Sequence, residues 1–474
     1  MKASLMKTTK KVKYRGHLHV LFLFLVFAIS SEICHGYKDI TVEYEFGCTW
    51  LGGSMSGTLT CSCFEGAKEM YLQKGDIPSF DTFAINIKNC NSVKFGSEVI
   101  ATSRNLRTIQ LANINNLNFE ESSLFWDGYA ENINPFSYAQ SPEYADRTMP
   151  GLKISIINST IHDIARYTFK GRMNEIVFKN VSIDQISSFA FTSLVQTVRV
   201  EFIDTAFKTI HPQAFKKFTT NNLLLSGDSF ESVPSRAFSE VVVLESFSIK
   251  NCKFSRVYSS AFIIKDPRYF DILNSQFDIL DGDGFKVTTR GDVGVKGNIF
   301  NITNGGAFLG IQLNMEQVAV EQKFIFDNDT FNALHGDTLV VDSIGFQPVY
   351  TNIFLNQLCD CWVIEDKKFF DEIKCLLENG ERVTMKEYKD HNCSVFSGIS
   401  LVIIVVVVVL TLLVIIVPIV AVYIKRTYKG TKQKEYISDK NGKPLALILP
   451  DGRTYKETEL HVIVERTDLL TTDL

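Results

Sequence analysis

The sequence has little net charge and few residues of the kinds that carry out chemistry. Its 49 lysines and arginines nearly balance 53 aspartates and glutamates, for a formal net charge of −4. Bulk electrostatics therefore give no reason to expect a nucleic-acid partner or a strongly acidic one. Histidine occurs only eight times, whereas phenylalanine occurs 37 times. With 45% hydrophobic and 22% charged residues, the chain can bury a large core.

Motifs for catalysis and metal binding are equally scarce. His162, His211, His335 and His391 have no carboxylate or nucleophile at motif spacing, and no glycine-rich phosphate loop is present. The run DILDGDGF at 278–285 crowds three carboxylates into one turn. It lacks a full calcium-loop motif and so predicts an ordinary Asp/Gly turn. We expect no catalytic residue, no metal and no cofactor.

The first of two apolar runs predicts a signal peptide. Val20–Ile29 follows a basic segment at 10–15 and is too short to span a bilayer. The small residues Cys34 and Gly36 stand at the spacing that a signal peptidase favours. We therefore assign 1–36 to the signal peptide.

The second apolar run predicts a transmembrane helix. Residues 399–424 carry no charge, and at about 1.5 Å per residue they exceed a hydrocarbon core of about 30 Å. A buried core helix is the alternative. The basic residues at 425–434 belong on the cytoplasmic side. This places 37–398 outside the cell and 425–474 inside, in a type I plasma-membrane protein.

An outside location changes how the ten cysteines are interpreted, because disulfides persist there. Cys34 is expected to leave with the signal peptide, and Cys252 stands alone in mid-chain. The others cluster near the two ends of the predicted ectodomain: Cys48, Cys61, Cys63 and Cys90, then Cys359, Cys361, Cys375 and Cys393. Five Asn-x-Ser/Thr sequons predict glycosylation in the same region, at Asn158, Asn180, Asn301, Asn328 and Asn392.

An eight-residue step between apolar residues recurs along the predicted ectodomain. The anchors are Ile161, Ile183, Phe207, Phe230, Phe254, Phe277, Phe300 and Phe331, and their partners eight residues later are Phe169, Phe191, Phe215, Phe238, Phe262, Phe285, Phe308 and Leu339. Most successive anchors lie 22 to 24 residues apart, and each unit begins with a short alternating strand such as ISI at 154–156. Such a period predicts a solenoid, in which every coil fills one slice of a core that no single unit could bury.

The repeat resembles the extracellular leucine-rich-repeat family, whose pattern is LxLxxNxIxxIxxxAF. SIKNCKFSRVYSSAF at 248–262 is similar to it through Ile249, Phe254, Val257 and the final Ala-Phe pair. The resemblance covers 85–339, including two degenerate units, INIKNCNSV and IQLANINNL. It implies a leucine-rich-repeat-like solenoid with parallel β-strands on a concave face, closed by disulfide caps.

One departure from the family pattern keeps a rival fold open. The recurring asparagine comes two residues after the second strand leucine, where the family has it three after, at Asn89, Asn113, Asn158, Asn180, Asn251, Asn274 and Asn328. Right-handed parallel β-helices also stack asparagines and have coils of similar length. The step of three from each anchor to the next apolar residue favours the leucine-rich repeat, because a following strand would need a step of two. Cys252 falls at the family's asparagine position, which predicts a buried thiol.

The end clusters of cysteines resemble the family's caps. The resemblance to the family's C-terminal cap implies that Cys359 pairs with Cys375 and Cys361 with Cys393. The N-terminal pairing stays open because Cys90 lies inside a repeat. The predicted organisation is signal peptide 1–36, N-terminal cap 37–84, solenoid 85–357 with an insertion at 122–151, C-terminal cap and stalk 358–398, transmembrane helix 399–424 and cytoplasmic tail 425–474.

Function is then expected from surfaces, since outward strand residues of leucine-rich repeats commonly bind proteins. The predicted ligand surface comprises Ser155, Ile157, Val177, Lys179, Glu201, Ile203, Leu224, Ser226, Ser248, Lys250, Asp271, Leu273, Gly294 and Lys296. Its mixture of apolar and charged residues suits an extracellular or cell-surface protein better than a polyanion. A second candidate is the insertion, with the aromatic residues Phe125, Trp126, Tyr129, Phe136, Tyr138 and Tyr144.

The tail is too short for a sizeable signalling domain and is expected to recruit other proteins. ERTDLL resembles an acidic dileucine signal for clathrin adaptors, through Glu465, Leu469 and Leu470. The terminal TTDL resembles a PDZ-domain ligand, through Thr472 and Leu474. A cell-surface recognition or adhesion protein without catalytic activity is therefore the main interpretation. The alternatives are a structural or trafficking membrane protein and, less favoured, a β-helix enzyme acting on polysaccharides.

Overall fold

The fold was analysed in a computed structural model, which describes most of the chain between residues 46 and 430. The described residues are 46–52, 57–77, 82–127, 151–195, 197–333, 337–342, 344–361, 372–393, 400–430, 437–438, 444–448 and 454–455. The predicted signal peptide 1–36 lies outside them. The chain divides into two units, Met1–Asn392 and Cys393–Leu474.

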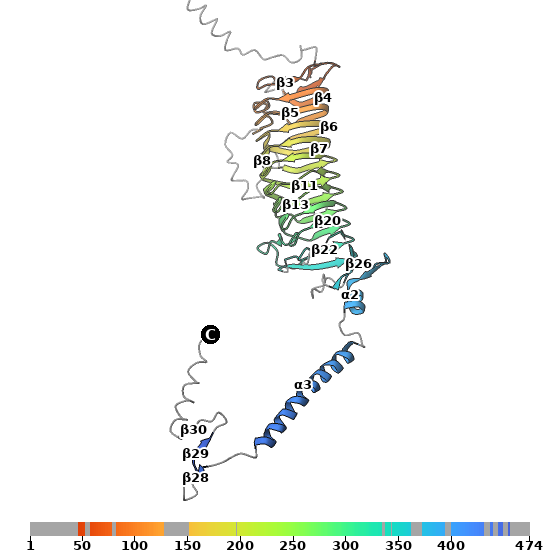
Figure 1. The fold of residues 1–474 in the computed structure, drawn as a ribbon. Coiled ribbons are helices and arrows are strands. Elements are labelled where there is room, and N and C mark those ends of the chain that lie inside the picture. Colours follow the sequence, from red (N-terminus) through yellow and green to blue (C-terminus); the bar gives the residue numbers. More distant parts are fainter. Residues whose placement is uncertain are drawn as a thin grey trace, which may run out of the picture. The chain divides into compact units, whose positions relative to one another are not determined.

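The first unit is a parallel β-solenoid of about 12 turns (Figure 1). A full coil places strands on three lines, and each strand pairs in parallel with its equivalents in the coils before and after. The first line contains β2 (Gly57–Ser62), β4 (Thr82–Phe95), β5 (Thr108–Phe119), β6 (Leu152–Ile164), β7 (Phe169–Ile186), β9 (Thr197–Ile203), β11 (Phe215–Ser226), β13 (Phe238–Lys250), β16 (Tyr269–Leu273), β19 (Val293–Lys296), β22 (Gln322–Asp327) and β24 (Phe346–Thr351).

The longer strands turn corners and also contribute to the second and third lines. The C-terminal parts of β4 to β7 belong to the second line, and the N-terminal parts of β7, β11 and β13 belong to the third. The other strands of the second line are β3 (Met70–Leu72), β10 (Ala206–Ile210), β12 (Ser229–Phe230), β14 (Lys253–Phe254), β17 (Gln276–Leu280), β20 (Ile299–Thr303), β23 (Thr330–Phe331), β25 (Ile353–Leu358) and β26 (Ile373–Leu376). Those of the third line are β8 (Phe191–Val195), β15 (Phe262–Lys265), β18 (Phe285–Thr289) and β21 (Ile311–Leu313).

The second line corrects one step of the sequence reasoning. The step of three after each anchor favours a return without a strand, because a strand would need a step of two, yet the anchors lie in paired strands. In β17, Phe277 and Leu280 point into the core while two consecutive residues between them are only half-buried. Pairing with β20 continues across this irregularity, since Phe277 lies opposite Phe300. A local kink therefore lets a period of three persist within a parallel strand.

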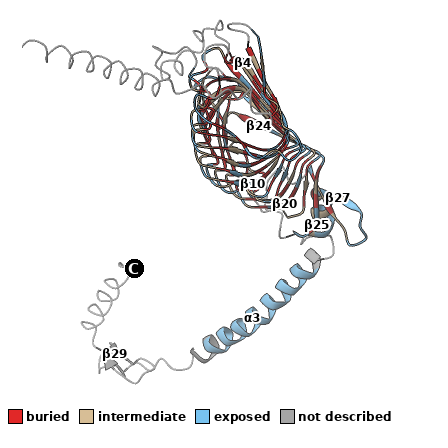
Figure 2. Ribbon diagram, turned by 90° about the horizontal axis from the view of Figure 1, so that it is seen from above, coloured by how far each residue is buried: buried red, intermediate tan, exposed pale blue. Residues whose placement is uncertain are grey.

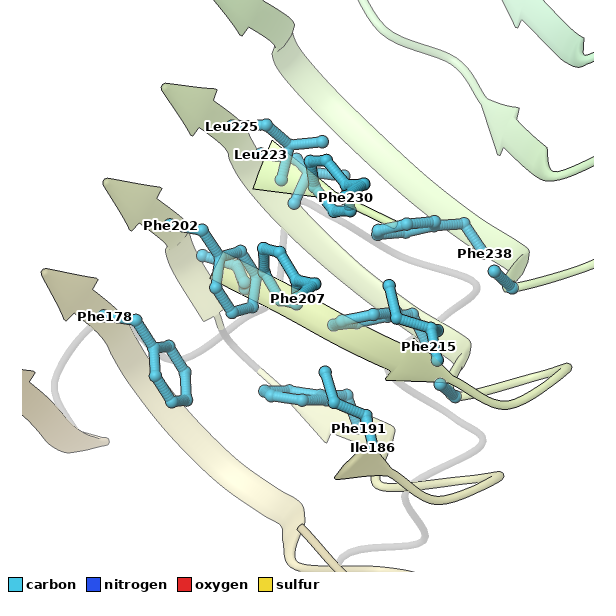
Figure 3. Packing of buried hydrophobic residues seen from close by; sticks show 14 of the residues in the cluster. Phe178, Ile186, Phe191, Phe202, Phe207, Phe215, Leu223, Leu225, Phe230 and Phe238 are labelled. Carbon is cyan, nitrogen blue, oxygen red and sulfur yellow. The ribbon is translucent and has the colours of Figure 1, made fainter. Parts of the chain in front are cut away.

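The aromatic residues of the eight-residue step form continuous stacks inside the solenoid (Figure 3). On the third line, the Phe191 and Phe215 ring centroids are 4.7 Å apart and those of Phe215 and Phe238 are 4.3 Å apart. On the second line, Phe207 and Phe230 stack at 4.5 Å. These spacings follow the separation of about 4.8 Å between paired strands, so each coil sets its ring on the next. In Figure 2 buried residues run through the strands of the solenoid, interspersed with half-buried and exposed ones.

The displaced asparagines form the corner between the first and second lines. The corner position has a positive φ in every coil from Asn89 to Asn352 and is occupied by Asn, Asp or Gly, the residues that adopt this conformation at the lowest cost. The side chains also link coils, because Asn113 Nδ2 donates to Asn89 Oδ1 at 2.8 Å and Asn180 Nδ2 donates to Asn158 Oδ1 at 3.0 Å. The displacement of the asparagines from the family's position therefore reflects the preference of this residue type for the positive-φ corner, where the chain turns.

A second, buried polar ladder occupies the next position of most coils, the family's own asparagine position. Its members include Ser159, Thr205, Asp228, Cys252, Ser275, Asn298 and Asp329. Ser159, Asp228, Ser275, Asn298 and Asp329 accept hydrogen bonds from backbone N–H groups of neighbouring coils. Ser275 Oγ accepts from Cys252 N at 3.1 Å, and Asn298 Oδ1 accepts from Ser275 N at 2.9 Å. Buried backbone donors at this corner are thereby paired, as a stable core requires.

This ladder predicts that the solenoid is more stable in mildly acidic than in alkaline solution. Burial raises the pKa of Asp228 to about 8, although N–H groups of Thr205 and Ser226 oppose the shift, and burial likewise raises the pKa of Asp329 to about 8. An unfolded aspartate loses its proton near pH 4. Between about pH 4 and pH 8 the folded state binds more protons, so stability is full below this window and falls as pH rises through it.

Thermal unfolding at pH 5.5 and pH 8 checks this expectation. The midpoint should be higher at pH 5.5, and Asp228→Asn should reduce the difference because asparagine does not titrate. Carboxylates with lowered pKa, such as Glu120 and Asp184, lose their contribution only in more acidic solution. A midpoint that rises from pH 5.5 to pH 8 would contradict the assignment.

Disulfides close both ends of the solenoid. Cys48 pairs with Cys61 and Cys63 with Cys90 at the N-terminal end, where β1 (Thr49–Leu51) packs antiparallel to β2. At the C-terminal end, Cys359 pairs with Cys375, the pair that the family resemblance implied. Cys361 and Cys393 are disulfide-bonded too. Here β27 (Arg382–Thr384) pairs antiparallel with β26, followed by α2 (Met385–Tyr388) and η6 (Lys389–Cys393), so the parallel stacking ends.

Cys252 is expected to be unreactive in the folded protein. Its side chain lies in the buried ladder, 2% exposed, and burial raises the pKa of its thiol to about 12. Since the thiolate is the reactive form, iodoacetamide should label Cys252 only after denaturation. Mass spectrometry of labelled native and denatured protein measures this. Labelling of the native protein within minutes would mean that this corner opens.

The second unit contains α3 (Ser400–Gly430), with Pro418 inside it. Within α3, Ile403–Arg426 is long and apolar enough to cross a membrane. The short strands β28 (Ile437–Ser438), β29 (Pro444–Ile448) and β30 (Thr454–Tyr455) follow and pair antiparallel.

Candidate ligand-binding face

The outer side of the first line carries two columns of side chains in register. Column 1 runs through Ser155, Val177, Glu201, Leu224, Ser248, Asp271 and Gly294, and column 2 through Ile157, Lys179, Ile203, Ser226, Lys250, Leu273 and Lys296. Successive members are about 4.8 Å apart. Residues from seven coils, far apart in the sequence, therefore form one continuous face that includes every predicted ligand-surface residue.

Most of this face is half-buried, so apolar and polar side chains reach its surface together. Ile157, Val177 and Ile203 are half-buried, and Lys179 is exposed. Ser248 differs from the expectation of an outward, accessible residue, because it is only 7% exposed. It is small and lies in register between Leu224 and Asp271, whose larger side chains shield it. A protein surface could contact the face but would reach little of Ser248.

A network of ion pairs borders column 1 on the side away from column 2. Lys153 Nζ lies 2.8 Å from Glu175 Oε1, Arg199 Nη2 lies 2.7 Å from Glu175 Oε2, and Arg199 Nη1 lies 3.5 Å from Glu201 Oε2. Burial would raise the pKa of Glu175, but hydrogen bonds from Lys153 and Arg199 keep it below its usual value. The sequence reasoning missed Lys153, Glu175 and Arg199, although each directly precedes an inward residue of the first line, namely Ile154, Ile176 and Val200.

Asp271 forms a recessed carboxylate near the C-terminal end of the face. Its Oδ1 lies over Gly294, where a Cβ would come within 2.5 Å of that oxygen. Burial raises the pKa of Asp271, and the nearby charges of Lys296 and Lys250 oppose the shift. Gly294 thus leaves the space that the carboxylate occupies. The pair makes the face both charged and close-packed at this point.

The insertion contributes two described aromatic residues, of which Trp126 is not a free contact site. Trp126 is buried, its indole N–H donates to Ser103 O at 2.9 Å, and Arg107 stacks over its ring. Phe125 is half-buried beneath Lys170. Trp126 therefore anchors the start of the insertion to the solenoid. Tyr129, Phe136, Tyr138 and Tyr144 lie outside the described residues.

The predicted glycosylation sites are grouped on one side of the solenoid. Asn158, Asn180 and Asn328 are exposed at the corner between the first and second lines, and Asn301 lies half-buried on the second line. Asn301 Nδ2 donates to Asp278 Oδ1 at 2.7 Å. Asn392, in η6, is exposed. The predicted tail residues Glu465, Leu469, Leu470, Thr472 and Leu474 lie outside the described residues.

Comparison with known protein families bears on the central coils of the solenoid. Residues 144–266 match the family model described as BspA type leucine rich repeat region, in six copies. The match supports a leucine-rich-repeat family for this chain. It spans the first-line face from Ser155 to Lys250, so the leucine-rich repeats carry much of the candidate site. No curated protein matches the chain significantly.

Proposed function

We propose that this protein is a single-pass cell-surface recognition or adhesion protein that binds a protein ligand through columns 1 and 2 of the first line. The observation that carries the proposal is the register of these columns, which joins half-buried apolar side chains and charged side chains of seven coils into one surface. Protein interfaces combine apolar contacts with a polar rim in this way. Binding without catalysis is part of the proposal, because the sequence offers no nucleophile and base at motif spacing.

The membrane topology belongs to the same proposal. The apolar helix Ile403–Arg426 would cross the plasma membrane once, with the solenoid outside and the tail inside. Basic residues after the helix favour this orientation. The tail would recruit clathrin adaptors through Leu469 and Leu470, and a PDZ domain through Leu474.

Proximity labelling on living cells tests recognition against the alternative structural or trafficking role. A peroxidase fused to the mature N-terminus of the full-length chain should label a reproducible set of extracellular or cell-surface proteins. The same fusion at the tail should label adaptor and PDZ proteins, and removal of Leu474 should eliminate the PDZ group. Labelling by the tail fusion alone, with no reproducible set outside the cell, would favour the trafficking role and contradict the proposal.

A further inference from the structure

A ladder of alternating aromatic and cationic side chains lies at the corner between the second and third lines. We call it the corner patch, and it consists of Phe125, Arg166, Tyr167, Lys170, Phe189 and Lys216. The Tyr167 and Phe189 rings stack at 6.0 Å, and the Arg166 guanidinium lies 5.5 Å from the Phe189 centroid. Lys170 Nζ lies 5.2 Å from Phe125 and 5.4 Å from Tyr167, and Lys216 Nζ lies 5.4 Å from Phe189.

The two central rings occupy a strained backbone position. Tyr167 has φ 59° and Phe189 has φ 63°, a conformation that bulky side chains rarely adopt. Other coils place Ser122, Gln213 and Gly306 at this corner. The core does not require aromatic residues here, since Tyr167 and Phe189 are only half-buried. Strain held at a surface position of this kind is typical of binding sites.

The corner patch carries positive charge that the solenoid does not neutralise. Among the described residues, neither Arg166 nor Lys170 forms an ion pair with a carboxylate, and Lys216 has only Glu240, at 3.8 Å. The rings hold the long cationic side chains in place, which lowers the entropy cost of binding a partner. The patch is therefore a preorganised surface that fits negative charge.

The position of the patch leaves it accessible to a partner. The sequons at Asn158, Asn180 and Asn328 lie at the other corner, and Asn301 lies on the second line. Carbohydrate attached at these sites would leave the corner between the second and third lines uncovered. The patch also lies on a different side of the coil from columns 1 and 2, so the two surfaces can be tested separately.

We infer that the corner patch docks an acidic segment of a partner protein, an inference that rests on the proposed function in protein recognition. Tyrosine, phenylalanine and arginine are enriched where proteins bind each other, and tyrosine and arginine dominate the energetics of such sites. The unneutralised Arg166 and Lys170 select carboxylates, with arginine offering paired donors. The half-buried rings provide apolar contact between the charges. A protein segment with acidic residues flanking an apolar one matches this order.

The test measures binding of two labelled probes to the full-length chain in nanodiscs. One probe is a glutamate-rich peptide with a central tyrosine, and the other is a heparin oligosaccharide. The double variant R166E/K170E reverses the charge of the patch. Its matched control is K265E/K286E, which makes the same change at two exposed lysines of the third line. A second variant, Y167N/F189N, replaces the rings with a residue that tolerates positive φ and so preserves the fold.

We expect the peptide to bind the wild-type chain, with affinity reduced at least about tenfold by R166E/K170E and by Y167N/F189N. K265E/K286E should retain the affinity, and the thermal midpoint of every variant should stay within a few degrees of wild type. Equal loss in K265E/K286E, or no peptide binding by the wild type, would overturn the inference. Patch-dependent binding of heparin without the peptide would assign the surface to a sulfated glycan and also overturn it.

Two further variants distinguish binding at the corner patch from binding at the first-line face and from occupation of the patch by the insertion. I157R/I203R, on column 2, should bind the peptide like wild type, so that failure of the first-line face and failure of the patch remain distinguishable. Deletion of 128–150 should leave peptide binding unchanged. If the peptide bound only after that deletion, the insertion itself would be the occupant of the patch, and the inference would be wrong.

Discussion

Replacing Phe215 with alanine is expected to lower the free energy of unfolding by about 3–5 kcal/mol. The Phe215 ring lies between Phe191, at 4.7 Å, and Phe238, at 4.3 Å, and is fully buried. Alanine would leave a cavity on both sides, and neighbouring coils cannot collapse into it without breaking the strand register. Chemical denaturation followed by circular dichroism measures the change.

The control for Phe215 is a phenylalanine outside the stacks. Phe64 is 61% exposed, so Phe64→Ala should change the unfolding free energy by no more than about 0.5 kcal/mol. In a solenoid, each coil is stabilised mainly by its neighbours, so the loss at Phe215 should also loosen the adjacent coils. A loss below about 1 kcal/mol for Phe215→Ala would show that the ring is not part of a close-packed core.

Replacing Asn298 with leucine should have an effect of similar size, although the two side chains have the same number of heavy atoms and a similar branched shape. The Asn298 amide accepts from Ser275 N and donates to Ile272 O and Asp329 Oδ1, each at 2.9 Å. Leucine would leave a buried N–H and a buried carbonyl unpaired, at about 1–3 kcal/mol each. It would also remove a donor from the carboxyl of Asp329, which is itself buried.

Asn118 provides the matched control for Asn298. It is half-buried on β5, and Asn118→Leu should cost less than about 1 kcal/mol because surface substitutions rarely cost more. Denaturant titrations of both variants at one pH compare the two changes directly. Equal stability of Asn298→Leu and wild type would mean that the buried polar ladder does not hold neighbouring coils together.

The phenylalanine periodicity made the solenoid predictable, whereas the path of each coil was less so. A ring such as Phe238 must recur once per coil because every coil has to fill the same slice of core, and this requirement is visible in the sequence. The second line of strands was not visible in the sequence, because the pair Asp278 and Ile279 breaks the alternation that signals a strand. Hydrogen bonding with neighbouring coils maintains that strand despite the broken pattern.

The candidate surfaces, too, could be predicted only in part from the sequence. Columns 1 and 2 could be predicted, because alternation along a strand decides which residues point outward. The shielding of Ser248 could not, since it depends on the sizes of Leu224 and Asp271 in neighbouring coils. The corner patch could not be predicted either. Tyr167 and Phe189 occupy a backbone conformation that their residue types do not signal, and Phe125 joins them from another coil.

The buried polar ladder escaped sequence reasoning for a chemical reason. Its members Asp228, Ser275 and Asn298 differ in type, yet each provides an oxygen that a backbone N–H of a neighbouring coil needs. A search for a single residue type, such as asparagine, finds the exposed corner position and overlooks the buried position beside it. A search for any small polar residue after the corner would have found it.

The most direct test of the proposed function compares two matched double variants on living cells. I157R/I203R places charge on the first-line face, whereas I279R/I302R makes the same change on the second line, where Ile302 is 46% exposed. If the first-line face recognises a protein ligand, extracellular proximity labelling should lose its reproducible partners in I157R/I203R and keep them in I279R/I302R, at equal surface expression. Partners retained in I157R/I203R, or lost only in I279R/I302R, would contradict this account.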